Sequence, residues 1–187
     1  MDEVTKAIRQ KNSQWFAQQT SISKLTPEER KKRLGSKYPI FSFTEKILTR
    51  TSPSLPARLD WRNYNGNSYV TPVKEQGDCG ACWAFAVSAA LESKILITQN
   101  TPNIPLDVSE QVLTSCSDAG NCDAGYINLA SDFISNYGLP PEYCYPYTSA
   151  NGACANSCPD WPLIAYSVSG WSLVDPNVDA IKDALYN

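Results

Sequence analysis

The seven cysteines of this 187-residue chain all lie between residues 79 and 158. They are Cys79, Cys82, Cys116, Cys122, Cys144, Cys154 and Cys158. An odd, clustered set is typical of paired cystines plus one free thiol, and cystines persist in an oxidising compartment. The sequence therefore predicts a cross-linked domain with one reactive thiol. The alternative is a reduced chain that holds a metal ion through its thiolates.

The charge of the chain is divided between two parts. Residues 1–54 carry eleven Lys and Arg against five Asp and Glu, a net charge of +6, and residues 55–187 carry five against fourteen, a net charge of −9. We expect the two parts to attract each other. The basic residues are spread through helix-like segments with Trp15 and Phe16 instead of forming a run, so we expect no nucleic-acid partner.

The lengths of the apolar runs limit the kinds of membrane or export segment that the chain can contain. None approaches the roughly 18 consecutive apolar residues of a membrane span, so we expect no membrane partner. The first residues, MDEVTKAIRQKN, also lack the apolar centre of a secretory signal. The protein is therefore either not exported or lacks its true N-terminus, and the cysteines favour the second interpretation.

The N-terminal part predicts two helices within residues 1–35. The second has clear boundary signals, with Thr26 as its cap, Pro27 at its first position and Gly35 as its stop. Residues 36–60 contain three prolines and indicate an extended connector, with a domain boundary near Leu55.

The C-terminal part predicts four more helices and one strand. A helix from Cys82 to about Gln99 is apolar on most faces and should be buried. The other expected elements are a helix after Ser109 that runs to Cys116, a helix between Tyr126 and Tyr137, a strand over Ala165–Val174, and a helix with Asp175 as cap and Pro176 at its first position.

The spacing of Cys79 and Cys82 allows three interpretations. A redox pair usually has a Trp before its first cysteine, whereas Trp83 follows the second. A zinc site could use Cys79, Cys82, Cys116 and Cys122, but these spacings do not match a finger or a ribbon. The third is a nucleophile: Cys82 begins a helix whose dipole stabilises a thiolate, and Gln76 on the preceding loop could donate to an oxyanion.

The segment QGDCGACWAF, residues 76–85, contains the pattern C-G-[SA]-C-[WY] and resembles the papain-like cysteine peptidases. LPARLDWR resembles the start of a mature enzyme of that family, and VSEQVLTSC, NCDAGY and CYPYTSANGAC resemble its second helix, its substrate-binding turn and the loop beyond. The resemblance implies an α+β, papain-like fold. Of that fold the chain would hold a short propeptide, residues 1–54, and the mainly helical left half, residues 55–187, without most of the β-rich right half.

The resemblance also implies roles for five residues. Cys82 would be the nucleophile, and Gln76 would form the oxyanion hole with the Cys82 backbone amide. Gly125 would pair by main chain with an extended substrate, while Tyr126 and Ile127 would wall the pocket for the residue two before the scissile bond. The family usually has Asn-Gly-Gly where this chain has Asp-Ala-Gly at 123–125, so the glycine at the binding position is kept.

Cystine pairing, partners and location follow from the same resemblance. It implies the pairs Cys79–Cys122, Cys116–Cys154 and Cys144–Cys158, and no metal or other cofactor. It implies a peptide or protein substrate, the chain's own propeptide as an intramolecular inhibitor, and a lysosomal, vacuolar or secreted location. Cathepsin B, a carboxydipeptidase of the family, carries a long occluding insertion after its binding turn. Here the helix between Tyr126 and Tyr137 follows Cys122 almost at once and leaves no room for such an insertion, so we expect an endopeptidase.

The chain contains no histidine. The family's mechanism needs an imidazole to hold the thiolate and to protonate the leaving amine. The family's His and Asn lie about 130 to 150 residues beyond the nucleophile, and the chain ends 187 − 82 = 105 residues beyond Cys82. We therefore expect a proenzyme truncated before both residues. A non-catalytic remnant or inhibitor-like binding module, and a thiol redox protein, are the alternatives.

Overall fold

The computed structural model describes residues 2–13, 15–37, 47–48 and 55–187. The α-helices of these residues are α1 (Asp2–Gln10), α2 (Pro27–Lys31), α3 (Cys82–Gln99), α4 (Glu110–Cys116), α5 (Ile127–Asn136) and α6 (Val178–Tyr186). Short 3₁₀ turns lie at Ile22–Lys24, Trp61–Asn63, Glu142–Cys144, Cys154–Asn156 and Trp161–Leu163. The strands β1 (Ile47–Leu48) and β2 (Leu173–Val174) form a parallel pair.

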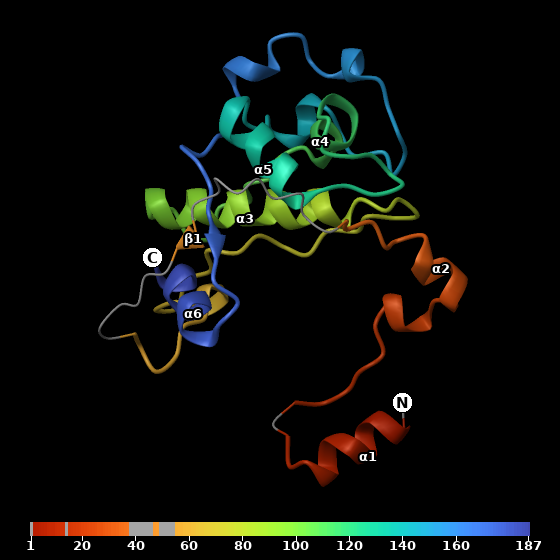
Figure 1. The fold of residues 1–187 in the computed structure, drawn as a ribbon, viewed down its shortest axis with the longest axis vertical. Helices are drawn as coiled ribbons and strands as arrows, with labels where there is room; N and C mark the ends of the chain where they lie inside the picture. The colour runs from red at the N-terminus through yellow and green to blue at the C-terminus, as the bar shows by residue number, and fades with distance from the viewer. Residues whose placement is uncertain (1, 14, 38–46, 49–54) are drawn as a thin grey trace.

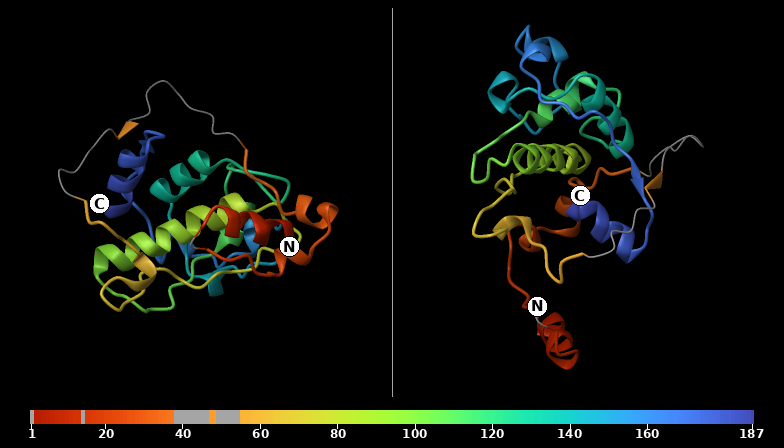
Figure 2. Two further views of the ribbon diagram at one scale, coloured as in Figure 1. Left: turned by 90° about the horizontal axis from the view of Figure 1, so that it is seen from below. Right: turned by 90° about the vertical axis from the view of Figure 1, so that its left-hand side faces the viewer.

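Helix α3 is the central element of the fold. It lies between α4 and α5 on one side and α6 on the other, as two views at right angles show (Figures 1 and 2). It ends at Asn100, whose left-handed backbone (φ 49°) is one that asparagine tolerates well. Because apolar residues occur around most of its circumference, this helix is stable only where other elements cover it.

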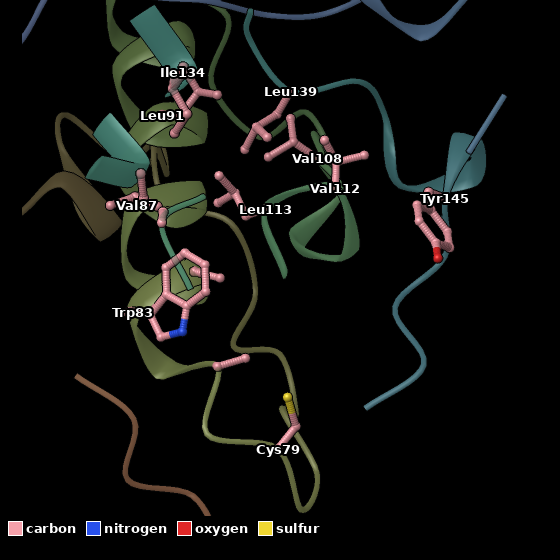
Figure 3. Close-up of a cluster of buried hydrophobic side chains, with 14 residues drawn as sticks. Cys79, Trp83, Val87, Leu91, Val108, Val112, Leu113, Ile134, Leu139 and Tyr145 are labelled. Atoms are coloured by element: carbon pink, nitrogen blue, oxygen red, sulfur yellow. The ribbon is translucent and has the colours of Figure 1, made fainter. Parts of the chain in front are cut away.

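The core forms where α3 meets α4 and α5. Trp83, Val87 and Leu91 project from successive turns of α3, and Leu113 of α4 lies opposite them (Figure 3). Ile134 of α5 closes the cluster near Leu91 (Figure 3). The side chains of Trp83 and Leu113 are completely buried, so these helices hold α3 in place mainly by excluding water from apolar surface.

Three cystines join the loops of this core to one another. The bonds are Cys79–Cys122, Cys116–Cys154 and Cys144–Cys158, which are the pairs expected from the sequence, and Cys82 is the free cysteine. The first closes a loop with a sequence separation of 43 residues, which in the chain-entropy view stabilises the fold by about 4 kcal/mol. Since Cys79 bonds to Cys122, it does not form a redox pair with Cys82.

The N-terminal residues extend away from this core. Helix α2 lies at one end of α3, and α1 stands apart from the rest of the described chain in two views (Figures 1 and 2). Residues 33–37 contact the turn that contains Gly125, and β1 pairs with β2. Within the described ranges, no helix combines the length and the apolar character that a membrane crossing requires.

Three boundaries differ from the sequence-based expectations. Helix α2 has the predicted Thr26 cap but ends at Lys31 instead of continuing to Gly35. The strand expected over 165–174 is reduced to Leu173–Val174, because Tyr166 forms only an isolated bridge with Leu139. The last helix begins at Val178 and not at Pro176, since Asn177 is its cap in place of Asp175 and the side chain of Asn177 accepts a hydrogen bond from the Ala180 amide. The connector expected over 36–60 lies largely outside the described residues.

Replacing Leu113 with alanine should test the packing of α4 on α3. Because Leu113 is fully buried, the Leu113→Ala change should lower the free energy of unfolding by about 2–5 kcal/mol. Urea unfolding with the cystines intact measures this. Leu163→Ala is the matched control, since Leu163 is 85% exposed and should change the value by less than about 0.5 kcal/mol. Equal losses in both variants would contradict the assigned core.

Candidate functional site

Cys82 is the first residue of α3 and the free thiol of the chain. Ala81 precedes it as N-cap without a side-chain hydrogen bond, so no capping side chain competes for the first amides of the helix. These amides and the dipole of an 18-residue helix favour negative charge at the position of Cys82. Cys82, which is half-buried, therefore lies at the positive end of the helix dipole.

Gln76 lies on the loop that leads into α3. Its side-chain Nε2 donates to the carbonyl of Cys79 at 2.7 Å and to the carbonyl of Arg33 at 2.9 Å. The first bond holds the amide against its own loop, and the second directs its other hydrogen at a carbonyl oxygen from the N-terminal segment. An amide that already binds a carbonyl oxygen has the chemistry that an oxyanion requires.

The turn that contains Gly125 is fixed against the same loop. The Cys79–Cys122 bond and a hydrogen bond of 2.7 Å from the Gly80 amide to the Cys122 carbonyl join the two loops. A side chain at Gly125 would meet the ring of Trp83 at 2.3 Å. Only glycine therefore allows this backbone to lie on the first turn of α3.

Residues 33–37 of the N-terminal segment run across this site. The amide of Gly125 donates to the Gly35 carbonyl at 2.7 Å, and the amide of Lys37 donates to the Gly125 carbonyl at 2.9 Å. The segment thus pairs with both main-chain groups of Gly125 in a parallel bridge at Ser36. These groups are the ones that the sequence predicts for an extended substrate.

The close approach of the segment depends on Gly35. A Cβ atom at this position would lie 1.6 Å from the carbonyl oxygen of Gly80. Arg33 adds charge to this contact, because its guanidinium pairs with Glu75 and, at 3.7 Å, with Asp78. Lys32 also lies 3.8 Å from Asp78. The basic and acidic parts of the chain therefore meet next to Gln76.

Tyr126 and Ile127 lie at the start of α5, next to Gly125. Tyr126 is the N-cap of α5, and its ring carries the ammonium of Lys37 at 5.1 Å from its centroid. Ile127 is 40% exposed. The described contacts do not bring the two side chains together around a pocket, so their role as pocket walls stays a prediction.

A charged cluster around Lys74 connects the loop before Gln76 to the helices that it packs against. The ammonium of Lys74 lies 2.8 Å from the carboxylate of Glu92, 2.5 Å from that of Asp107 and 2.8 Å from that of Glu110. Burial lowers the pKa of Lys74, but the hydrogen bonds to these three carboxylates outweigh it and raise the pKa overall. Lys74 therefore stays charged and ties the loop before Gln76 to α3 and α4.

Two carboxyl groups at or near this cluster, Glu110 and Glu142, have raised pKa values. Burial raises the pKa of Glu110 to about 7, against the opposing effect of Lys74. Burial also raises the pKa of Glu142, whose Oε2 atom is buried without a hydrogen-bond partner. Asp107, Glu110 and Glu142 offer oxygens close enough together for a metal ion. Since Lys74 already supplies a positive charge there, the donor set does not favour a cation.

Sequence reasoning missed two parts of this site. It treated Gly35 only as a helix stop, although Gly35 lies so close to the Gly80 backbone that a side chain there would clash. It also did not identify the cluster around Lys74. The division of charge signalled that the two parts attract, but charge totals do not say which arginine meets which carboxylate.

Comparisons with known proteins find a family model and several relatives that the chain resembles. The model of the papain family of cysteine proteases matches residues 55–187. Cysteine proteinase 3 of Solanum lycopersicum is 35% identical over 157 residues, and fruit bromelain of Ananas comosus is 35% identical over 167 residues. These alignments cover 80% and 88% of this chain but 42% of each relative.

The solved structures agree with the sequence relatives. The digestive procathepsin L2 proteinase of the Tenebrio molitor larval midgut superposes with a TM-score of 0.73 at 30% identity, over 90% of this chain and 55% of that protein. The recombinant stem bromelain precursor gives a TM-score of 0.63 at 29% identity, over 88% and 52%. The chain thus spans about half the length of the relatives that it matches.

Acidification should stabilise the fold. A carboxyl group whose pKa is raised in the folded state binds more protons there than in the unfolded state, so stability falls as pH rises from the unfolded pKa through the folded one. For Glu110 this window runs from 4.5 to about 7. The chain contains no histidine, the residue that usually titrates in this range.

Urea unfolding of the intact, oxidised chain at about pH 5 and about pH 7.5 measures this effect, in which each pKa unit corresponds to about 1.4 kcal/mol. The urea concentration at the unfolding midpoint should be higher at the lower pH. Glu110→Gln should reduce the difference between the two midpoints. Asp118→Asn changes an exposed carboxylate outside the cluster and serves as control. Greater stability of the unmodified chain at about pH 7.5 would contradict the sign.

Gly35→Ala should lift the N-terminal segment away from the site. Overpacking of this kind costs about 1–3 kcal/mol, so the population with the segment detached should rise about tenfold, and Cys82 should react faster with iodoacetamide by a similar factor. Ser36→Ala, at an exposed neighbour, should leave the rate unchanged. A rate that does not respond to Gly35→Ala would show that the segment does not shield Cys82.

Proposed function

Because this chain belongs to the papain family of cysteine proteases, we propose that it is part of the proenzyme of a cysteine endopeptidase. The observation that carries this proposal is that the free thiol of Cys82 opens α3 directly after the loop of Gln76, and that the turn leading to Gly125 is bonded to this loop through Cys79–Cys122. In this proposal the substrate is a peptide or protein, and Cys82 is the nucleophile.

The reaction assigns a step to each group. The Cys82 thiolate attacks the scissile carbonyl carbon, and the carbonyl oxygen takes up the electron pair as an oxyanion. Gln76 Nε2 and the Cys82 backbone amide stabilise this oxyanion. Collapse of the intermediate breaks the carbon–nitrogen bond and expels the amine, which must receive a proton, while the acyl group stays on Cys82 as a thioester that water then hydrolyses. These 187 residues contain no histidine to supply it, so in this proposal an imidazole and its Asn partner come from residues beyond Asn187.

Residues 1–54 act in this proposal as a propeptide that inhibits residues 55–187. The Arg33 carbonyl occupies the Gln76 amide, and residues 35–37 occupy the main-chain groups of Gly125. A substrate that needs the same hydrogen bonds cannot bind until the segment leaves. Tyr126 and Ile127 are proposed to form part of the pocket wall once Lys37 has left the ring of Tyr126.

The cystines support a location where thiols are oxidised, and we propose a lysosomal, vacuolar or secreted one. Endopeptidase character is supported by the turn after Cys122, which leads directly into α5 at Ile127. This short connection has no room for a loop that would close one end of the substrate groove.

Peptidase assays of the 187-residue chain and of its natural longer form should test the function. The 187-residue chain should show no turnover of an unfolded peptide, since it lacks an imidazole. The longer form, once matured near Leu55, should cleave the peptide internally. In that form Cys82→Ala should abolish turnover, and Gln76→Ala should lower kcat by about 10²- to 10³-fold.

Two outcomes would contradict the proposal. Turnover by the 187-residue chain alone would mean that the missing base is not needed, and turnover by the longer Cys82→Ala protein would mean that another residue is the nucleophile. Binding of a related protease without turnover by any form would instead favour an inhibitor-like module.

A further inference from the structure

The main-chain carbonyl of Gln76 accepts two hydrogen bonds from one distant loop. The Tyr147 hydroxyl donates to it at 2.9 Å, and the Ser149 hydroxyl donates to it at 3.0 Å. These donors lie 71 and 73 residues further along the chain. Neither hydroxyl is part of the predicted oxyanion hole, and neither contacts Cys82 in the described structure.

The peptide group between Gln76 and Gly77 is therefore fixed from outside its own loop. Gly77 has a left-handed backbone (φ +61°), and a side chain there would meet the Ser149 hydroxyl at 2.1 Å. The rotamers open to a side chain depend on its backbone conformation. Holding this peptide group thus restricts the direction in which the Gln76 side chain leaves the backbone.

The loop that carries the two hydroxyls is itself held firmly. Its alternate residues face two glutamines: Tyr147 and Ser149 face Gln76, whereas the amide of Thr148 donates to Gln111 Oε1 at 2.8 Å. Gln111 Nε2 in turn donates to the Ala150 carbonyl at 2.9 Å, and Gln111 is completely buried in α4. The loop is a rigid support instead of a free surface strand.

Tyr147 has further anchors. Its amide donates to Glu142 Oε1 at 2.6 Å, and its ring meets Phe85 of α3 edge-on with centroids 4.8 Å apart. Burial raises the pKa of Tyr147 to about 12, so its hydroxyl stays a donor across the range in which a protein of this kind works. The ring contact also connects the support to the first turn of α3, which carries Cys82.

We propose that Tyr147 and Ser149 are positioning residues that hold the Gln76 main chain so that its side-chain amide points at the oxyanion. This inference rests on the proposed function for the identity of the oxyanion donor. An oxyanion donor is effective only if it needs no reorganisation when charge develops. A donor on a loop meets this condition through such supporting contacts.

The Gln76 side-chain amide in the 187-residue chain provides the first test. Its two protons are observed in ¹⁵N–¹H spectra and assigned by their loss in Gln76→Ala. We expect Tyr147→Phe with Ser149→Ala to speed exchange of these protons about tenfold or more, because the loop opens more often. Tyr143→Phe is the matched control, since Tyr143 is 75% exposed on the same segment. Unchanged exchange in the double variant overturns the inference.

A kinetic cycle on the active, longer form is the second test. Tyr147→Phe and Ser149→Ala should each lower kcat about 3- to 10-fold with KM unchanged, the usual effect of one lost hydrogen bond. In the Gln76→Ala background the same changes should have no further effect on kcat. Equal losses in both backgrounds would indicate a purely structural role and overturn the inference.

The two tests also separate this inference from the proposed function. The spectra do not depend on turnover, so they decide the positioning role even if the longer form proves inactive. If the longer form is active but the Gln76 amide does not respond to loss of the hydroxyls, the proposed function stands and the positioning role is wrong.

Discussion

The bond between Cys79 and Cys122 is the constraint on which the geometry of the site depends. It joins the loop before α3 to the turn that carries Gly125, and the hydrogen bond between Gly80 and Cys122 adds a second connection beside it. Along the chain the two loops are 43 residues apart, with α3 and α4 between them. The site is therefore a junction of two loops, held at the end of a buried helix.

The N-terminal segment fits this junction through main chain more than through side chains. Its hydrogen bonds to Gln76 and Gly125 use the backbone of residues 33–37, and the backbones of Gly35 and Gly80 lie too close to leave room for a side chain at Gly35. The charged pairs of Arg33 with Glu75 and Asp78 lie at the margin. Exposed ion pairs contribute little each and weaken in salt, so the close backbone fit determines where the segment lies.

The sequence predicted the elements that rest on local signals. Helix α3 follows from its apolar run and α4 from the Ser109 cap, and both have the predicted bounds. The predicted end of α2 at Gly35 was wrong. Lys and Arg residues can continue a helix as well as end it, so the basic run did not fix the position of the last turn. The supports of Gln76 had no sequence signal, since a hydroxyl that donates to a distant main-chain carbonyl leaves no pattern in residue type or spacing.

The Gln76 side-chain amide donates a hydrogen bond to the Arg33 carbonyl. In our proposal the same amide therefore has two roles. In the papain-family enzyme that we propose, the atom that would stabilise the reaction is the same atom that the inhibitory segment occupies. A mutation that removes this amide would loosen the inhibitor and disable the catalyst in one event. In the proposed enzyme, damage at this position would therefore release only a strongly weakened protease.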